Sequence, residues 1–195
     1  MTEFDSSRRR ANCKLVLYGP GLSGKTTSLE FLNKKLGPKQ CGRIVVRQAE
    51  SKRSLVFEFF PVSMPKYQDI DIRVQVYAVP GQSFYQRTRK AVLKGVDAVL
   101  FVADSASSRL EANIDSCAEL EENLTRYGES LASIPHVIAY NKRDLEDAVA
   151  VETLRRELNE HGAPDFEAVA TKGTGVLEAF RALLPGLGKR VKKEI

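Results

Sequence analysis

The sequence has few of the residues that mark a secreted, metal-binding or membrane protein. It contains three cysteines in 195 residues, Cys13, Cys41 and Cys117, an odd number without the spacing of a metal site. No apolar run is long enough to cross a membrane, and the opening residues MTEFDSSRRRANC lack the apolar stretch of a secretory signal. Together these absences predict a protein of the reducing cytoplasm.

Features that attach a protein to a membrane or to nucleic acid are also scarce. The C-terminal end KRVKKEI carries no lipidation box, and no glycine follows Met1. The net charge is +5, but basic clusters occur only at residues 8–10 and 189–193, and both signs are mixed elsewhere. We therefore expect no nucleic-acid groove and no stable membrane anchor. Solvated chain ends are the simple interpretation, and weak attraction to an anionic membrane surface is the alternative.

Strand-like apolar runs alternate with helical patterns along the whole chain. With 43% hydrophobic and 28% charged residues, and no repeat or linker, the composition indicates one globular domain over residues 1–195. Its ends are a basic extension at residues 1–10 and a helix with a basic end at residues 175–195. We expect strands at 13–19, 43–48, 54–62, 71–79, 96–104, 135–141 and 166–170, and helices at 25–37, 87–95, 108–127, 151–161 and 175–192.

This element order predicts an α/β fold with helices on both faces of a mixed, mostly parallel sheet. The strands at 43–48, 54–62 and 71–79 follow one another without an intervening helix. Such neighbours favour antiparallel pairing, so we expect one antiparallel edge.

The segment GPGLSGKT, residues 19–26, has the pattern of a phosphate-binding loop between a strand and a helix. Its glycines let backbone N–H groups approach phosphate oxygens, and the helix N-terminus favours negative charge. Lys25 can reach the β- and γ-phosphates, and the Thr26 hydroxyl can bind Mg²⁺. A plain tight turn is the alternative. The nucleotide-binding residues predicted here are Gly19, Gly21, Leu22, Ser23, Gly24, Lys25, Thr26 and Thr27.

The tetrapeptide NKRD, residues 141–144, stands at the end of a predicted strand, on the same rim as the phosphate loop. The Asp144 carboxylate can accept hydrogen bonds from N1–H and the 2-amino group of guanine, whereas adenine would leave it unpaired. Asn141 and Lys142 belong to the same motif, and an exposed charged loop is the alternative interpretation. In VATKGTG, Val169 and Ala170 end the next strand, and the Ala170 N–H could donate to guanine O6.

These motifs, together with YAVPGQSFY and RKAVLKGVDAVLFVADS, make the chain resemble the small Ras-like GTPases over nearly its whole length, and within them the bacterial MglA family. The resemblance implies a P-loop NTPase G domain that uses GTP, GDP and Mg²⁺ as a switch in cell polarity or motility. It also implies slow hydrolysis stimulated by a Roadblock-fold MglB-like activating protein. Effectors would bind the switch regions, and partners would recruit the protein to the cell poles or inner membrane surface.

Further site residues follow from the resemblance. Gln82, after Gly81, would position the attacking water, and Arg53 would be an intrinsic arginine finger, with a solvated loop charge as its alternative. Ser54 would bind both nucleotide and Mg²⁺ in place of a threonine. The resemblance also implies that the strand near residues 54–60 slides in register. Its two apolar faces fit a static central strand equally well.

One position departs from the usual pattern, because Ala78 stands where most such GTPases have an aspartate near Mg²⁺. Ser54, Val56 and Glu58 share a strand face, so Glu58 could reach a Mg²⁺-bound water. A solvated strand charge is the alternative for Glu58.

Ala78 and Ser54 keep open a second function, a nucleotide-bound scaffold with negligible hydrolysis. A small-molecule kinase or ATPase is a third possibility, which NKRD and Gln82 disfavour. His136 and His161 belong to no catalytic group in the sequence.

Overall fold

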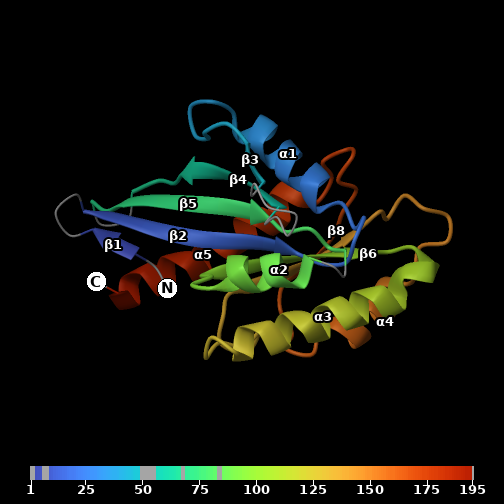
Figure 1. The fold of residues 1–195 in the computed structure, drawn as a ribbon. Helices are drawn as coiled ribbons and strands as arrows, with labels where there is room; N and C mark the ends of the chain where they lie inside the picture. The colour runs from blue at the N-terminus through green and yellow to red at the C-terminus, as the bar shows by residue number, and fades with distance from the viewer. Residues whose placement is uncertain (1–2, 6–8, 49–55, 67–68, 83–84, 195) are drawn as a thin grey trace.

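The computed structural model describes residues 3–5, 9–48, 56–66, 69–82 and 85–194. Within these residues, eight strands form one sheet in the order β3-β4-β5-β2-β6-β7-β8, with β1 paired to β2 (Figure 1). The strands are β1 Glu3–Asp5, β2 Arg10–Tyr18, β3 Val45–Gln48, β4 Val56–Ser63, β5 Asp71–Ala78, β6 Ala98–Asp104, β7 His136–Asn141 and β8 Asp165–Glu167.

The sheet is parallel from β5 through β2, β6 and β7 to β8, and antiparallel where β3, β4 and β5 pair. The predicted mixed sheet with one antiparallel edge is therefore confirmed. Strand β6 is buried along its whole length, as expected for a central parallel strand with both faces covered.

Helices cover both faces of the sheet, as predicted. Helices α1 (Lys25–Leu36) and α5 (Val176–Glu194) pack on one face and share a core with β2, β4 and β5. Helices α2 (Gln86–Leu93), α3 (Leu110–Thr125) and α4 (Val151–Leu158) pack on the other face, with the short 3-10 helix η2 (Ser107–Arg109) before α3 (Figure 1). No helix among the described residues is long and apolar enough to span a membrane.

Several predicted boundaries differ from the structure. The sequence pattern did not reveal β1, which pairs with the start of β2 inside the predicted basic extension. Helix α4 ends at Leu158 because the side chain of Asn159 turns the chain, bonding both the N–H and the carbonyl oxygen of Ala163. Strand β3 begins only at Val45, and β8 ends at Glu167 before a turn in which the Val169 N–H donates to Thr174.

Candidate nucleotide-binding site

The phosphate loop connects β2 to α1 and requires glycine at two points. Gly19 has φ 141°, and a Cβ there would lie 2.2 Å from the carbonyl oxygen of Val102. Gly24 has φ 100°, and its Cβ would lie 2.2 Å from Nδ2 of Asn141. Gly24 precedes α1 without a side-chain cap, so the first N–H groups of the helix face the loop. This arrangement suits an anion.

Lys25 is buried inside the loop, with 6% of its surface exposed. Its ammonium donates to the carbonyl oxygens of Gly19 and Pro20 at 2.8 and 2.6 Å. Burial lowers the pKa of Lys25 to about 7, and repulsion from Arg89 and Arg109 adds to the effect. Arg89 and Arg109 carry the same charge as the Lys25 ammonium, so a phosphate bound in the loop would supply the compensating negative charge.

A cavity of about 400 Å³ joins the phosphate loop to the segment that carries Gln82. Its lining residues are Leu22, Gly24, Lys25, Thr26, Thr27, Val79, Pro80, Gly81, Gln82 and Tyr85. The structure thus brings Lys25, Thr26 and Gln82 to one space. Arg53 and Ser54 lie outside the described residues.

Gly81 packs directly on the phosphate loop. A Cβ at this position would lie 2.4 Å from the nitrogen of Gly21 and 2.5 Å from the carbonyl oxygen of Pro20. Only glycine allows this approach without a backbone shift. The segment that carries Gln82 therefore contacts the phosphate loop at Gly81, one residue before Gln82.

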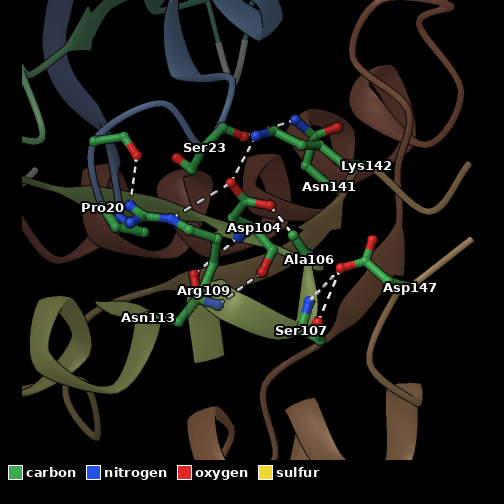
Figure 2. Close-up of polar contacts among 12 residues, drawn as sticks. Pro20, Ser23, Asp104, Ala106, Ser107, Arg109, Asn113, Asn141, Lys142 and Asp147 are labelled. Atoms are coloured by element: carbon green, nitrogen blue, oxygen red, sulfur yellow. Dashed lines mark hydrogen bonds and ion pairs between the residues drawn. The ribbon is translucent and has the colours of Figure 1, made fainter. Parts of the chain in front are cut away.

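Asn141 connects the phosphate loop to the loop after β8. Its Nδ2 donates to the carbonyl oxygen of Ser23 at 2.7 Å (Figure 2). Its Oδ1 accepts from the Ala170 N–H at 2.8 Å. A guanine O6 would have to share that Ala170 donor with Asn141. The proposed Ala170 contact with the base stays a prediction.

Ion pairs hold the other two residues of NKRD that were predicted to bind nucleotide, Lys142 and Asp144. Lys142, at φ 65°, donates to Oδ2 of buried Asp104 at 2.6 Å (Figure 2). Asp144 is exposed, and its carboxylate lies 3.2 Å from Nζ of Lys172. Because Asp144 is at the surface, the ion pair holds it only weakly and leaves it accessible to a base.

Sequence reasoning missed two residues of the site, Asp104 and Arg109. Asp104 ends β6 and accepts from Lys142, while Arg109 from η2 donates to the carbonyl oxygen of Gly21 at 2.9 Å and lies 3.9 Å from Asp104. The position of Asp104 at a strand end on the motif rim could have identified it. No sequence signal indicated Arg109, because its reach depends on how η2 packs.

Comparison with known proteins places this geometry in a family. The model of the ADP-ribosylation factor family matches residues 3–185. Mutual gliding-motility protein MglA of Myxococcus xanthus is 44% identical over 193 residues, which cover 99% of each chain. The chain belongs to the MglA-like small Ras-family GTPases.

More distant small GTPases match as well. Ypt/Rab-type GTPase ypt7 of Pyricularia oryzae and Ras-related protein RABG3f of Arabidopsis thaliana are each 24% identical over 183 residues. These matches cover 91% of this chain and 83% and 82% of theirs. As a member of this family, the MglA-like GTPase binds guanine nucleotide and hydrolyses GTP. The predicted fold class and enzyme class are confirmed, and the kinase alternative is not supported.

Proposed function

We propose that this GTPase is a molecular switch in cell polarity or motility, which binds partners with GTP and releases them with GDP. The cavity that joins Lys25, Thr26 and Gln82 is the main support, because it puts phosphate binding and a responsive segment in one space. The similarity to a gliding-motility protein supports the cellular process. Partner binding would bring the protein to the cell poles or the inner membrane surface.

Mg²⁺ fits the site through hydroxyl groups rather than carboxylates. Thr26 lines the cavity beside Lys25, and Ser54 would add a second hydroxyl. Among the described residues, no three His, Cys, Asp or Glu side chains cluster to hold a metal. Bound Mg²⁺ would neutralise phosphate charge and orient the phosphates. Phosphate oxygens and waters would complete its octahedron.

We assign the hydrolysis of GTP to two residues, Gln82 and Arg53. Gln82 is exposed and lines the cavity, and its backbone carbonyl accepts from Arg89 at 2.6 Å. It would orient the attacking water, and Arg53 would stabilise the charge that develops on the phosphates. A Roadblock-fold MglB-like activator would accelerate turnover by ordering both residues. Effectors would bind the same switch surfaces in the GTP state.

Two measurements test the function together. The nucleotide released from denatured purified protein is identified by chromatography, and phosphate release is then measured with and without an MglB-like protein. Guanine nucleotide and slow turnover that the partner raises are expected. Guanine nucleotide without turnover in either condition supports the scaffold, and adenine nucleotide contradicts the assignment of the base.

A further inference from the structure

Glu58 lies in a row of paired residues that crosses the sheet close to the phosphate loop. Glu58 of β4 is the antiparallel partner of Ala78 of β5, and Ala78 is the parallel partner of Leu17 of β2. Leu17 comes two positions before Gly19, where the phosphate loop begins. The row therefore sits at the rim of the sheet from which the site is built.

The side chain of Glu58 faces the layer that contains α1. Residues directly opposite each other in a sheet point to the same face, and every second residue along a strand shares that face. Ala78 and Phe60 both belong to the core shared with α1 and α5. Glu58 thus points to the side of the sheet where the first turn of α1 carries Thr26.

One carboxylate oxygen of Glu58 is buried and unpaired. Oε2 is shielded from solvent and has no hydrogen-bond partner among the described residues. A buried carboxylate oxygen without a donor is costly, and such groups normally have a partner. This burial argues against a simple solvated strand charge. A donor that meets Oε2 would have to approach from the α1 side of the sheet.

We propose that Glu58 replaces the acid missing at Ala78, by accepting a hydrogen bond from a water bound to the nucleotide's Mg²⁺. The two positions face each other across β4 and β5, so a carboxylate on the longer side chain of Glu58 covers the space beside the small Ala78. Glu58 is a positioning residue in this role, since it acts through the water. The inference rests on the proposed Mg²⁺-dependent nucleotide site.

The test measures Mg²⁺ affinity rather than turnover. Release of a fluorescent GDP is followed while free Mg²⁺ is titrated in the parent, Glu58→Gln and Glu58→Gln with Ala78→Asp. Glu58→Gln keeps the shape but loses the charge, and should raise the Mg²⁺ concentration for half-maximal retention by about 10–100-fold. Ala78→Asp should restore most of that loss. Glu30→Gln, on the exposed side of α1, is the matched control and should leave the midpoint unchanged.

Thermal unfolding gives an independent readout on the same proteins. Without Mg²⁺, Glu58→Gln should be at least as stable as the parent, because a neutral amide replaces a carboxylate of which one oxygen is buried without a donor among the described residues. With GDP and Mg²⁺, its gain in melting temperature should be smaller than that of the parent. If Glu58→Gln does not fold, Glu58→Asp keeps the charge on a shorter arm and should shift the midpoint in the same direction.

The outcomes separate this inference from the proposed function. If the rate of GDP release from the parent protein does not depend on Mg²⁺, the proposed metal site itself is contradicted. A Mg²⁺-dependent parent with an unchanged midpoint in Glu58→Gln overturns the role of Glu58 alone. A shift that Ala78→Asp fails to reduce also overturns it, because the two positions would then not be equivalent.

Discussion

Arg89 of α2 and Glu119 of α3 form a bidentate ion pair whose arginine is 3% exposed. The same guanidinium donates to the carbonyl oxygens of Pro80 and Gln82, at 3.1 and 2.6 Å. One buried side chain therefore fastens the Gln82 segment to α3. Removing it would leave the Glu119 carboxylate and two carbonyl oxygens without their donor.

Arg89→Met should lower the free energy of unfolding by roughly 2–3 kcal/mol, less than a fully buried pair because Glu119 is partly exposed. It should also reduce partner-stimulated turnover, because the Gln82 backbone is no longer fixed. Urea unfolding and single-turnover assays measure the two effects. Arg126→Met breaks an exposed pair with Glu122 and is the control, with little change expected. Equal losses in both variants would contradict the anchoring role.

Asp144→Asn should exchange the preferred base. An amide at this position suits the 2-oxo group of xanthine, so preference for GTP over xanthosine triphosphate should fall by about 10–100-fold. Competition binding against a fluorescent nucleotide measures the ratio. Glu146→Gln changes an exposed carboxylate in the same loop and should keep the guanine preference. Unaltered selectivity in Asp144→Asn would remove this residue from the base site.

Gln82→Leu and Arg53→Ala should each suppress stimulated hydrolysis while leaving GTP affinity nearly intact. An arginine finger in related reactions contributes about 10³–10⁵ in rate, so the Arg53 variant should approach the unstimulated rate. Single-turnover kinetics with a saturating activator provide the test. Gln86→Leu, at an exposed position in α2, is the control for loss of a nearby amide. Parent-like stimulated rates in both variants would show that the roles are wrongly assigned.

Gly81→Ala should be more damaging than its single methyl group suggests. The added carbon would overlap backbone atoms of Pro20 and Gly21, so the segment that carries Gly81 and Gln82 must move. This movement should lower the free energy of unfolding by roughly 1–3 kcal/mol. Gly188→Ala in α5 meets open space and should instead stabilise the helix by about 0.5–1 kcal/mol. Thermal unfolding of both variants measures the contrast. Similar effects at the two positions would rule out a tight contact at Gly81.

Cys117 should react slowly with alkylating reagents at neutral pH. Burial, with repulsion from Glu121 and Glu160, raises the pKa of its thiol to about 11. At pH 8 the thiolate is therefore scarce in the folded protein, and its alkylation should be at least roughly tenfold slower than in the unfolded chain. The folded rate should keep rising with pH up to about pH 11. Iodoacetamide labelling read by mass spectrometry follows this site, and a plateau near pH 9 would disagree with it.

Local signals predicted the parts of this molecule that depend on neighbours in the sequence. The phosphate loop could be read because GPGLSGKT carries its own glycines, lysine and threonine between a strand and a helix. The antiparallel edge followed from strands too close for a crossover. In contrast, β1 is three residues long among charged residues, and only its pairing with β2 makes it a strand.

Contacts between residues far apart in the sequence could not be predicted from the sequence and are seen only in the structure. Arg109 reaches Gly21 across 88 positions of sequence, and Arg89 reaches Glu119 across 30. The alternation of β4 indicated which residues share a face with Glu58, but only the register places it opposite Ala78. Faces can be read from a periodic pattern, whereas register depends on the partner strand.

The amide of Asn141 has a consequence for how such an enzyme can change. Its side chain bonds the phosphate loop at Ser23 with one atom and the loop after β8 at Ala170 with the other. In the proposed site, where the loop after β8 holds the base, phosphate affinity and base preference would therefore not change independently. A variant redesigned for another base would have to keep Asn141 and alter only the groups around it, because loss of this amide would remove a contact from both loops at once.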